Sequence, residues 1–194
     1  FKKFPAWGSG QSPEALRKEK NMTMILVLIG IILGSVGLDQ LTKLLAVQYL
    51  KPIGSYPLWQ NVLHLTYVEN RGAAFGMLSN QRWVFMIFST VAIIGLAVYL
   101  FRFCKEGKWV KVALAMIIGG GIGNMIDRVA LGYVVDFVDF TLIHFAVFNV
   151  ADSFVSVGAV MLVIWFVRSM VTEYRNGKKK KADGTSEAHD DGTN

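Results

Sequence analysis

Cysteine is nearly absent from this chain, and charged residues are scarce. Cys104 is the only cysteine, which excludes an internal disulfide scaffold and a zinc site built from several cysteines. Only 18% of the 194 residues are charged and 53% are hydrophobic, whereas soluble domains carry about 25% charged residues. The same composition excludes a disordered or collagen-like chain. A lipid bilayer is therefore the solvent that this sequence fits.

Two common protease motifs are also missing. The three histidines, His64, His144 and His189, are scattered, and none belongs to a His-Glu-x-x-His pattern. Ser153 and Ser156 have no lysine or histidine at a spacing that suits a general base. The sequence thus disfavours a zinc protease and a serine protease, and we expect these serines to pack or cap helices.

Four apolar stretches lie between the charged residues, and they predict an all-α membrane protein with a four-helix bundle. A helix needs about 20 residues to cross about 30 Å of hydrocarbon, so the last two stretches can span only if they include Asp127 and Asp152. The predicted spans are residues 22–47, 82–102, 109–130 and 151–172. A cleaved secretory signal is the alternative for the first span, but no small-x-small cleavage site precedes a polar domain there.

The distribution of positive charge predicts how the bundle is oriented. Most of the 20 Lys and Arg residues lie in 1–21, 102–111 and 168–181. The positive-inside rule then places both termini in the cytoplasm and the loops 48–81 and 131–150 outside. The basic runs are thus topology signals that can contact anionic phospholipid, and not a nucleic-acid footprint.

The two ends of the chain differ from the four-helix domain over 22–172. Residues 1–21 have no apolar period and are interpreted as a cytoplasmic leader or an expression remnant. Residues 173–194 are rich in Lys and then in Gly, Asp and Thr, which predicts a disordered cytoplasmic tail.

A small β element is predicted outside the membrane, over about 52–69. Prolines and glycine break its first half, and a β-rich, half-alternating run follows from Val62 to Val68. We expect it to lie at the membrane surface, with Tyr56, Trp59 and Tyr67 at headgroup level. An ordinary interfacial loop is the simpler alternative.

Two aspartates within the predicted spans are the main candidates for chemistry, because a carboxylate in a span is costly and often functional. Asp127 and Asp152 should lie at similar depth, and each follows an asparagine three residues earlier, Asn124 and Asn149. A close carboxyl pair shares one proton and can hydrolyse a peptide bond. The alternative is that Asp127 pairs with Arg128 and that Asp152 caps a helix.

Other polar and small residues of the spans suggest structural roles. Gly120 and Gly123 belong to a glycine-rich stretch that would let helices approach closely. Asp39 and Lys43 are four residues apart, which suits a local ion pair. Asp136 lies in the second outer loop, where a surface strand or turn would account for it.

Five sequence blocks in order resemble the type II, or lipoprotein, signal peptidases of bacteria. They cover about residues 22–172 and are Asp39-Gln-Leu-Thr-Lys43, Val68-Glu-Asn-Arg-Gly-Ala-Ala-Phe-Gly76, Gly120-Gly-Ile-Gly-Asn-Met-Ile-Asp-Arg128, Val134-Val-Asp-Phe137 and Phe148-Asn-Val-Ala-Asp-Ser153. The resemblance implies an intramembrane aspartic endopeptidase of the bacterial cytoplasmic membrane that uses no metal and no cofactor. It would remove the signal peptide from diacylglyceryl-modified prolipoproteins, before the lipidated cysteine, and bind globomycin-type inhibitors.

The resemblance also implies roles for individual residues. Asp127 and Asp152 would be catalytic, and the β element would cradle the substrate at a site open sideways to lipid. The residues expected to bind substrate or shape the site are Asn70, Arg71, Asn124, Arg128 and Asn149. The expected structural supports are Asp39, Lys43, Gly120, Gly123 and Asp136.

Two other classes of function remain as alternatives. A small proton-coupled transporter or channel component would use Asp127 and Asp152 as relay carboxylates, but the other halves of the spans, such as 112–118 and 160–165, carry no ionisable residue. A structural membrane module would leave the two Asn-x-x-Asp segments unexplained.

Overall fold

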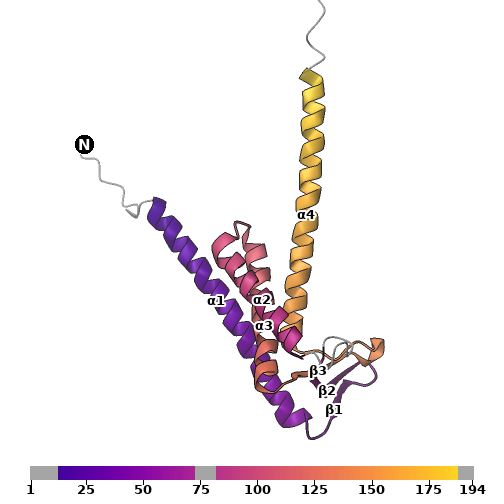
Figure 1. The fold of residues 1–194 in the computed structure, drawn as a ribbon. Coiled ribbons are helices and arrows are strands. Elements are labelled where there is room, and N and C mark those ends of the chain that lie inside the picture. Colours follow the sequence, from indigo (N-terminus) through magenta and orange to yellow (C-terminus); the bar gives the residue numbers. More distant parts are fainter. Residues whose placement is uncertain (1–12, 73–81, 188–194) are drawn as a thin grey trace, which may run out of the picture.

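The computed structural model describes residues 13–72 and 82–187 as four long helices and one small sheet (Figure 1). The helices are α1 (Pro13–Leu45), α2 (Arg82–Val98), α3 (Lys108–Ala130) and α4 (Val150–Glu187). All four are long and apolar enough to cross a membrane. Short π-helical turns extend α1 over Ala46–Leu50 (η1) and α2 over Tyr99–Phe103 (η3). The predicted four-helix membrane architecture is confirmed.

α3 is the central helix, and it packs against the other three. Half of its apolar window is buried, against about a tenth or less in the other helices. Small residues permit this packing, because an added Cβ at Gly119 would lie 2.7 Å from Ser35 Cβ of α1 and one at Gly120 would meet the Ala151 carbonyl oxygen of α4. Gly158 of α4 contacts α3 in the same way. The glycines therefore let three helices approach closely.

The sheet has three antiparallel strands in the order β1 (Ser55–Trp59), β2 (Leu63–Asn70) and β3 (Val134–Asp139). The hairpin of β1 and β2 lies where the sequence predicts a β element. β3 comes from the second connection and pairs with β2, with Asn70 opposite Val134 and His64 opposite Asp139. Ala46, Leu50, Val135 and Phe137 pack into a core that joins the sheet to the end of α1.

Both outer helices are longer than the sequence predicts. α1 begins at Pro13 rather than near residue 22, because proline suits the first turn of a helix and good helix formers follow it. α4 continues to Glu187, where the sequence predicts disorder from residue 173, because Lys, Arg, Ala and Glu extend a helix that no proline interrupts. Residues 1–12, 73–76 and 188–194, which belong to the predicted leader, the second sequence block and the tail, lie outside the described residues.

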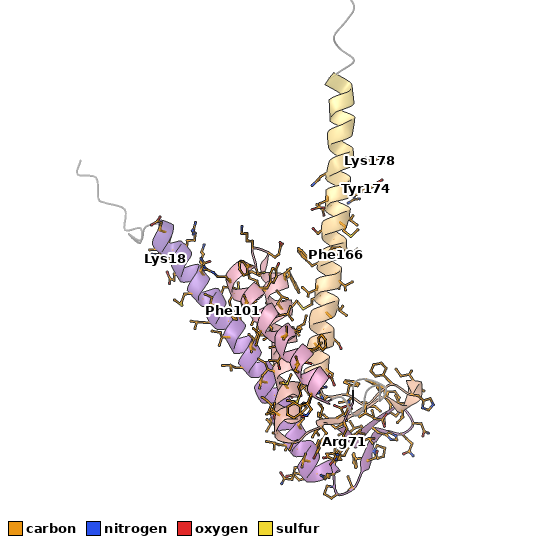
Figure 2. The ribbon with its side chains drawn as sticks, viewed as in Figure 1. Lys18, Arg71, Phe101, Phe166, Tyr174 and Lys178 are labelled. Carbon is orange, nitrogen blue, oxygen red and sulfur yellow. The ribbon has the colours of Figure 1, made fainter. Side chains whose placement is uncertain are left out.

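The four helices expose large apolar side chains over most of their length (Figure 2). Phe88 of α2 and Leu33 of α1 are more than 60% exposed. Such surfaces suit contact with hydrocarbon. By contrast, the buried polar side chains gather where α1 and α3 end, α4 begins and the sheet is attached.

Candidate functional site

A buried lysine holds the polar cluster together at the sheet end of the bundle. Lys43 Nζ lies 2.8 Å from Asp39 Oδ2 and 3.0 Å from Asp127 Oδ2, and it donates to Asn124 Oδ1 at 2.9 Å. The predicted Asp39–Lys43 ion pair is therefore confirmed. One positive charge between two carboxylates, with an amide oxygen as a third acceptor, satisfies the lysine in a site from which water is excluded.

Asp39 ties α1 to both neighbouring helices. Its Oδ1 accepts from the Ala151 backbone N–H at 2.9 Å, in the first turn of α4. Gly123 of α3 makes room for the carboxylate, since an added Cβ there would lie 2.6 Å from Asp39 Oδ2. A negative group at a helix N-terminus is stabilised by the helix dipole. Asp39 thus joins α1 to α4, and the absence of a side chain at Gly123 gives its carboxylate the space to do so.

Asp127 is neutralised and fully hydrogen-bonded within this cluster. Besides the ion pair with Lys43, its Oδ1 accepts from Gln40 Nε2 at 2.9 Å and its Oδ2 from the Val135 backbone N–H at 3.0 Å. Gln40 also donates to Asp39 Oδ2 and to the Gly123 carbonyl. The sequence analysis did not single out Gln40, because two of its acceptors lie on α3 and the spacing along α1 does not reveal them.

Asn149 and Asp152 form a reciprocal cap at the start of α4. The Asp152 N–H donates to Asn149 Oδ1 at 2.9 Å, and the Asn149 N–H donates to Asp152 Oδ2 at 3.2 Å. This is the capping-box pattern with an aspartate as its acid. The remaining Asp152 oxygen, Oδ1, accepts from Asn124 Nδ2 at 2.8 Å. The capping role that the sequence offered for Asp152 is thus present, and half of the carboxylate faces the α3 side of the cluster.

Asp136 of β3 lies deep in the same cluster and is 1% exposed. Two amide groups donate to it, Asn149 Nδ2 to Oδ1 at 2.6 Å and Asn70 Nδ2 to Oδ2 at 2.9 Å. Burial raises the pKa of the Asp136 carboxyl to about 6; the hydrogen bond from Asn70 opposes this rise, and the nearby charge of Asp152 adds to it. The structure thus corrects the expectation that a surface strand or turn accounts for Asp136.

The two candidates for a partner of Asp152 therefore have opposite environments. Asp127, the predicted one, is paired with the buried Lys43 at 3.0 Å. Among residues 13–72 and 82–187, the hydrogen bonds to Asp136 come from two amide groups; Asp136 is buried, and it interacts with the charges of Asp152 and Arg128. The geometry favours Asp136. The sequence contained a signal for this residue, because Asp136 is an acidic residue within the apolar run Val134-Val-Asp-Phe137. In the structure this run is a buried strand.

The predicted binding residues at the end of β2 divide into two groups. Asn70 points into the cluster and also accepts from the Gly72 N–H at 3.1 Å. Arg71 is exposed; it pairs with Glu69 at 3.0 Å and lies over the Tyr133 ring at 5.4 Å. With Lys51 on its other oxygen, Glu69 has a pKa lowered to about 2, chiefly by Arg71. Arg71 therefore lies at the rim of the cluster and not inside it.

Arg128 is half-buried on the last turn of α3. Its Nη1 donates to the Asn124 carbonyl at 3.4 Å. Asn124 itself bridges the two halves of the cluster, because its Oδ1 accepts from Lys43 and Asn149 while its Nδ2 donates to Asp152. The structure thus brings Asn124, Asn149 and Asn70 together with Asp127, Asp136 and Asp152, and leaves Arg71 outside.

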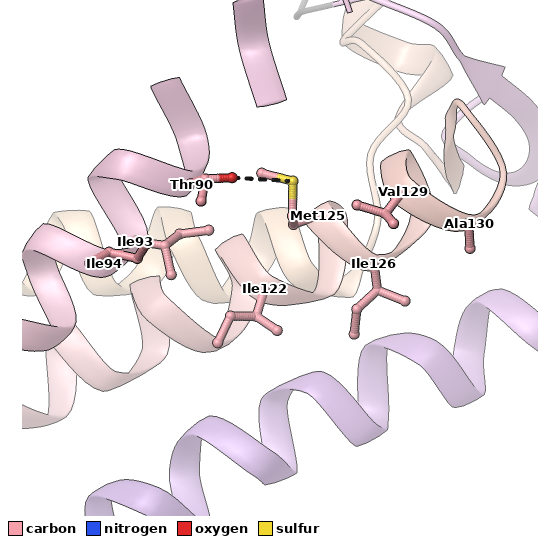
Figure 3. A pocket seen from close by; sticks show the side chains of 8 residues that line it. All are labelled: Thr90, Ile93, Ile94, Ile122, Met125, Ile126, Val129 and Ala130. Carbon is pink, nitrogen blue, oxygen red and sulfur yellow. Dashed lines mark hydrogen bonds between the residues drawn. The ribbon is translucent and has the colours of Figure 1, made fainter. Parts of the chain in front are cut away.

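Two further features bear on the chemistry. Among residues 13–72 and 82–187, no group of three or more His, Cys, Asp or Glu side chains has a metal-holding arrangement. A groove of about 360 Å³ lies between α2 and α3 (Figure 3), lined by Thr90, Ile93, Ile94, Ile122, Met125, Ile126, Val129 and Ala130. The eight residues that line this groove include no titratable group.

Comparisons with known proteins agree on one family. The family described as "Signal peptidase (SPase) II" matches residues 31–168. The lipoprotein signal peptidase of Caldanaerobacter subterraneus is 54% identical over 139 residues, which cover 72% of this chain and 92% of that protein. The lipoprotein signal peptidase of Streptococcus pneumoniae is 43% identical over 161 residues, 82% of this chain and 99% of that one.

Solved structures agree on the fold. Two structures described as a bacterial membrane enzyme resemble the chain, one with a TM-score of 0.70 and 32% identity over 75% of this chain and 90% of that one. The other has a TM-score of 0.66 and 33% identity, over 73% of this chain and 93% of that one.

Proposed function

Since the chain belongs to the signal peptidase II family of lipoprotein signal peptidases, we propose that it cuts diacylglyceryl-modified prolipoproteins just before the lipidated cysteine. As a member it is a multi-pass membrane enzyme of the aspartic peptidase class, and its substrates are prolipoproteins. We further propose that the carboxyl groups of Asp136 and Asp152 perform the cut. Asp136 then has the catalytic role that the sequence analysis expected for Asp127.

One observation supports this pair most directly. A single residue, Asn149, donates to both carboxylates, from its backbone N–H to Asp152 Oδ2 at 3.2 Å and from its side chain to Asp136 Oδ1 at 2.6 Å. Two carboxyls held on one asparagine cannot easily both ionise, so the pair retains a proton that each member alone would lose. Burial, with a smaller contribution from the charge of Asp152, raises the pKa of Asp136 to about 6.

The reaction needs both protonation states of the pair. The ionised carboxylate takes a proton from water while the water oxygen attacks the scissile carbonyl carbon, and the protonated carboxyl gives its proton to the carbonyl oxygen. The tetrahedral intermediate then collapses: the C–N bond breaks, the general base passes the proton that came from water to the leaving nitrogen, and one hydroxyl of the intermediate returns a proton to the general acid as the C=O bond reforms. We assign the retained proton to Asp136 and the general-base role to Asp152.

The polar residues around the pair keep the two carboxyls apart from the ionic part of the cluster. Asp127 binds Lys43 and, through the Val135 N–H at 3.0 Å, fixes the backbone next to Asp136. Asp127 is thus a positioning residue. Asn70 and Asn124 each donate to one carboxyl oxygen. Arg71 stands at the rim, where the substrate backbone would pass, and the half-buried Arg128 interacts with the charges of Asp152 and Asp136.

The site's position suits a lipid-anchored substrate. The pair lies where the helices meet the sheet, close to the end of the apolar spans. Acyl chains in the bilayer would hold the modified cysteine at that depth, and such remote binding energy orients the reacting bond. We further propose that this end faces the outside of the cytoplasmic membrane, that both termini are cytoplasmic, and that globomycin-type inhibitors occupy the same site next to phospholipid.

The test is cleavage of a diacylglyceryl-modified prolipoprotein by the purified protein in lipid, with a chelator present. We expect cleavage by the wild type that the chelator does not change, and loss of cleavage in Asp136→Asn and in Asp152→Asn while both variants stay folded. Cleavage retained by either variant removes that residue from catalysis. Failure of the wild type to cleave, together with proton flux in liposomes, would favour the transporter alternative.

A further inference from the structure

The far end of the sheet, away from the helices, carries a group of exposed apolar side chains. Leu58 and Trp59 end β1, and Leu142, Ile143 and Phe145 lie in the loop that follows β3, which includes a short 3-10 turn at Thr141–Ile143 (η4). All five are more than half exposed, from 52% for Phe145 to 69% for Trp59. We call these five residues the sheet tip.

The two segments of the sheet tip form one surface. The Leu142 N–H donates to the Val62 carbonyl in the β1–β2 turn at 3.5 Å, and Trp59 pairs with Leu63 across the hairpin. The loop of residues 140–148 returns to β3 through a bridge between Val138 and Phe148, with N···O distances of 2.8 and 3.0 Å. Stacking of Phe148 on Phe140 and its edge contact with Phe145 close the loop further. The exposed side chains therefore belong to an ordered loop.

The surroundings of the sheet tip indicate what covers it. Residues 52–68 and 140–151 contain no Asp, Glu, Lys or Arg. Contiguous apolar surface without charge is rare on a water-facing protein and marks a contact with another apolar phase. Tryptophan and tyrosine beside aliphatic residues are typical of the boundary between lipid headgroups and hydrocarbon.

The position of the sheet allows its tip to reach the boundary between lipid headgroups and hydrocarbon. It leaves the bundle at the end of the membrane-spanning helices and extends sideways, with the 141–143 turn at its far edge (Figure 1). β2 runs from Leu63 at the tip to Asn70 at the site, about 23 Å at 3.3 Å per residue. The tip thus lies beside the bundle, over the leaflet in which the helices end.

We propose that the sheet tip is a membrane anchor that inserts Leu142, Ile143 and Phe145, together with Leu58 and Trp59, into the lipid leaflet at the sheet end of the bundle. The anchor lies beyond the peptidase site and does not require the proposed catalytic pair. It extends the surface expected from the sequence, which named only Tyr56, Trp59 and Tyr67. Because β3 leads from Asp136 directly into the anchor, insertion would hold the site at a fixed height relative to the lipid.

Site-directed spin labelling tests the proposal, and the single cysteine makes it practical. In a Cys104→Ser background, Ile143→Cys and Leu58→Cys are labelled with a nitroxide in vesicles of phosphatidylcholine and phosphatidylglycerol. Phe88→Cys, on the lipid-facing side of α2, is the reference for hydrocarbon, and Lys105→Cys, in the exposed connection before α3, is the reference for water. Accessibility to oxygen and to a water-soluble nickel chelate is then compared.

We expect both tip labels to have an oxygen-to-nickel accessibility ratio that approaches that of Phe88→Cys. A ratio equal to that of Lys105→Cys would overturn the proposal, because the tip would then lie in water. Labels that are immobilised and protected from both reagents would also overturn it, because they would place a protein surface, such as a second copy of this chain, over the tip. None of these readings depends on peptide cleavage.

Discussion

Replacing Asp127 and Asp136 one at a time, by asparagine, tests whether Asp127 is an ionic support and Asp136 the catalytic acid that we propose. Asparagine keeps the shape of each side chain and removes its charge and its proton. Both aspartates are buried, yet their partners differ: Asp127 contacts Lys43 at 3.0 Å, whereas the hydrogen bonds that Asp136 accepts from the described residues come from the amides of Asn70 and Asn149. Asp127→Asn should therefore lose mainly stability, and Asp136→Asn should lose mainly turnover.

For Asp127→Asn we expect mainly a loss of stability. Breaking a buried ion pair costs about 3–5 kcal/mol when the remaining charge is left alone. Lys43 keeps Asp39 at 2.8 Å, so the loss reduces to that of hydrogen bonds to a charged group, about 1.5–3 kcal/mol. At about 2–4 °C per kcal/mol for a chain of this size, Tm falls by several degrees. Cleavage at a temperature well below Tm is reduced but measurable.

For Asp136→Asn we expect mainly a loss of turnover. General acid–base catalysis by one side chain contributes about 10²–10⁴-fold, and kcat should fall by that factor. Stability should not fall at neutral pH, because an ionised Asp136 is itself costly to bury, as its raised pKa of about 6 indicates. Tm of this variant therefore stays near that of the wild type.

The assay measures initial cleavage rates of a lipidated prolipoprotein in proteoliposomes, and Tm by intrinsic fluorescence on the same preparations. Asp139→Asn is the matched control, because Asp139 lies on the same strand, three residues from Asp136, and its hydrogen bond comes from Thr66. We expect it to cleave almost like the wild type. Turnover lost in Asp127→Asn at unchanged Tm, with turnover kept in Asp136→Asn, would refute the reasoning and restore the pairing of Asp127 with Asp152.

Three further outcomes follow from the geometry. The wild type should lose stability relative to Asp136→Asn as the pH rises from about 4 to about 6, measured as Tm against pH. The reason is that the Asp136 carboxyl has a pKa of about 6 in the fold and an ordinary value of 3.8, so its ionisation in this range destabilises the fold. A difference in Tm that does not change with pH contradicts the burial argument. Asn149→Ala removes a donor that lowers the pKa of Asp136, so the alkaline limb of kcat/KM should move to higher pH, while an unmoved limb would make Asn149 a cap only. Gly120→Ala should destabilise the protein by about 1–3 kcal/mol through overpacking against the Ala151 carbonyl. Gly95 has open space around it, so Gly95→Ala should leave Tm within about a degree or two of the wild type. Equal Tm values for the two variants would contradict close packing of α3 on α4.

The side-chain contacts that the sequence predicted correctly join residues close together in the chain. The Asp39–Lys43 pair and the contact between Asn149 and Asp152 each join residues three or four apart on one helix, where the spacing alone fixes the geometry. Gln40 was missed although it lies between two of them, because its three acceptors come mostly from α3 and the sequence does not say which face of α1 meets that helix.

By itself, the sequence determined the four membrane-spanning helices, since crossing a bilayer depends on the length of an apolar run, which is a one-dimensional property. It also determined that carboxylates and asparagines gather at one end of the spans. Only the tertiary structure showed which carboxylate shares Asn149 as a hydrogen-bond donor with Asp152. Asp127 belongs to the same Asn-x-x-Asp pattern as Asp152, but its turn of α3 faces Lys43. The register of β3 against β2 places Asp136, and not Asp127, next to Asn149. Distances between residues of different elements depend on how helices pack and strands align, and no spacing along the chain contains them.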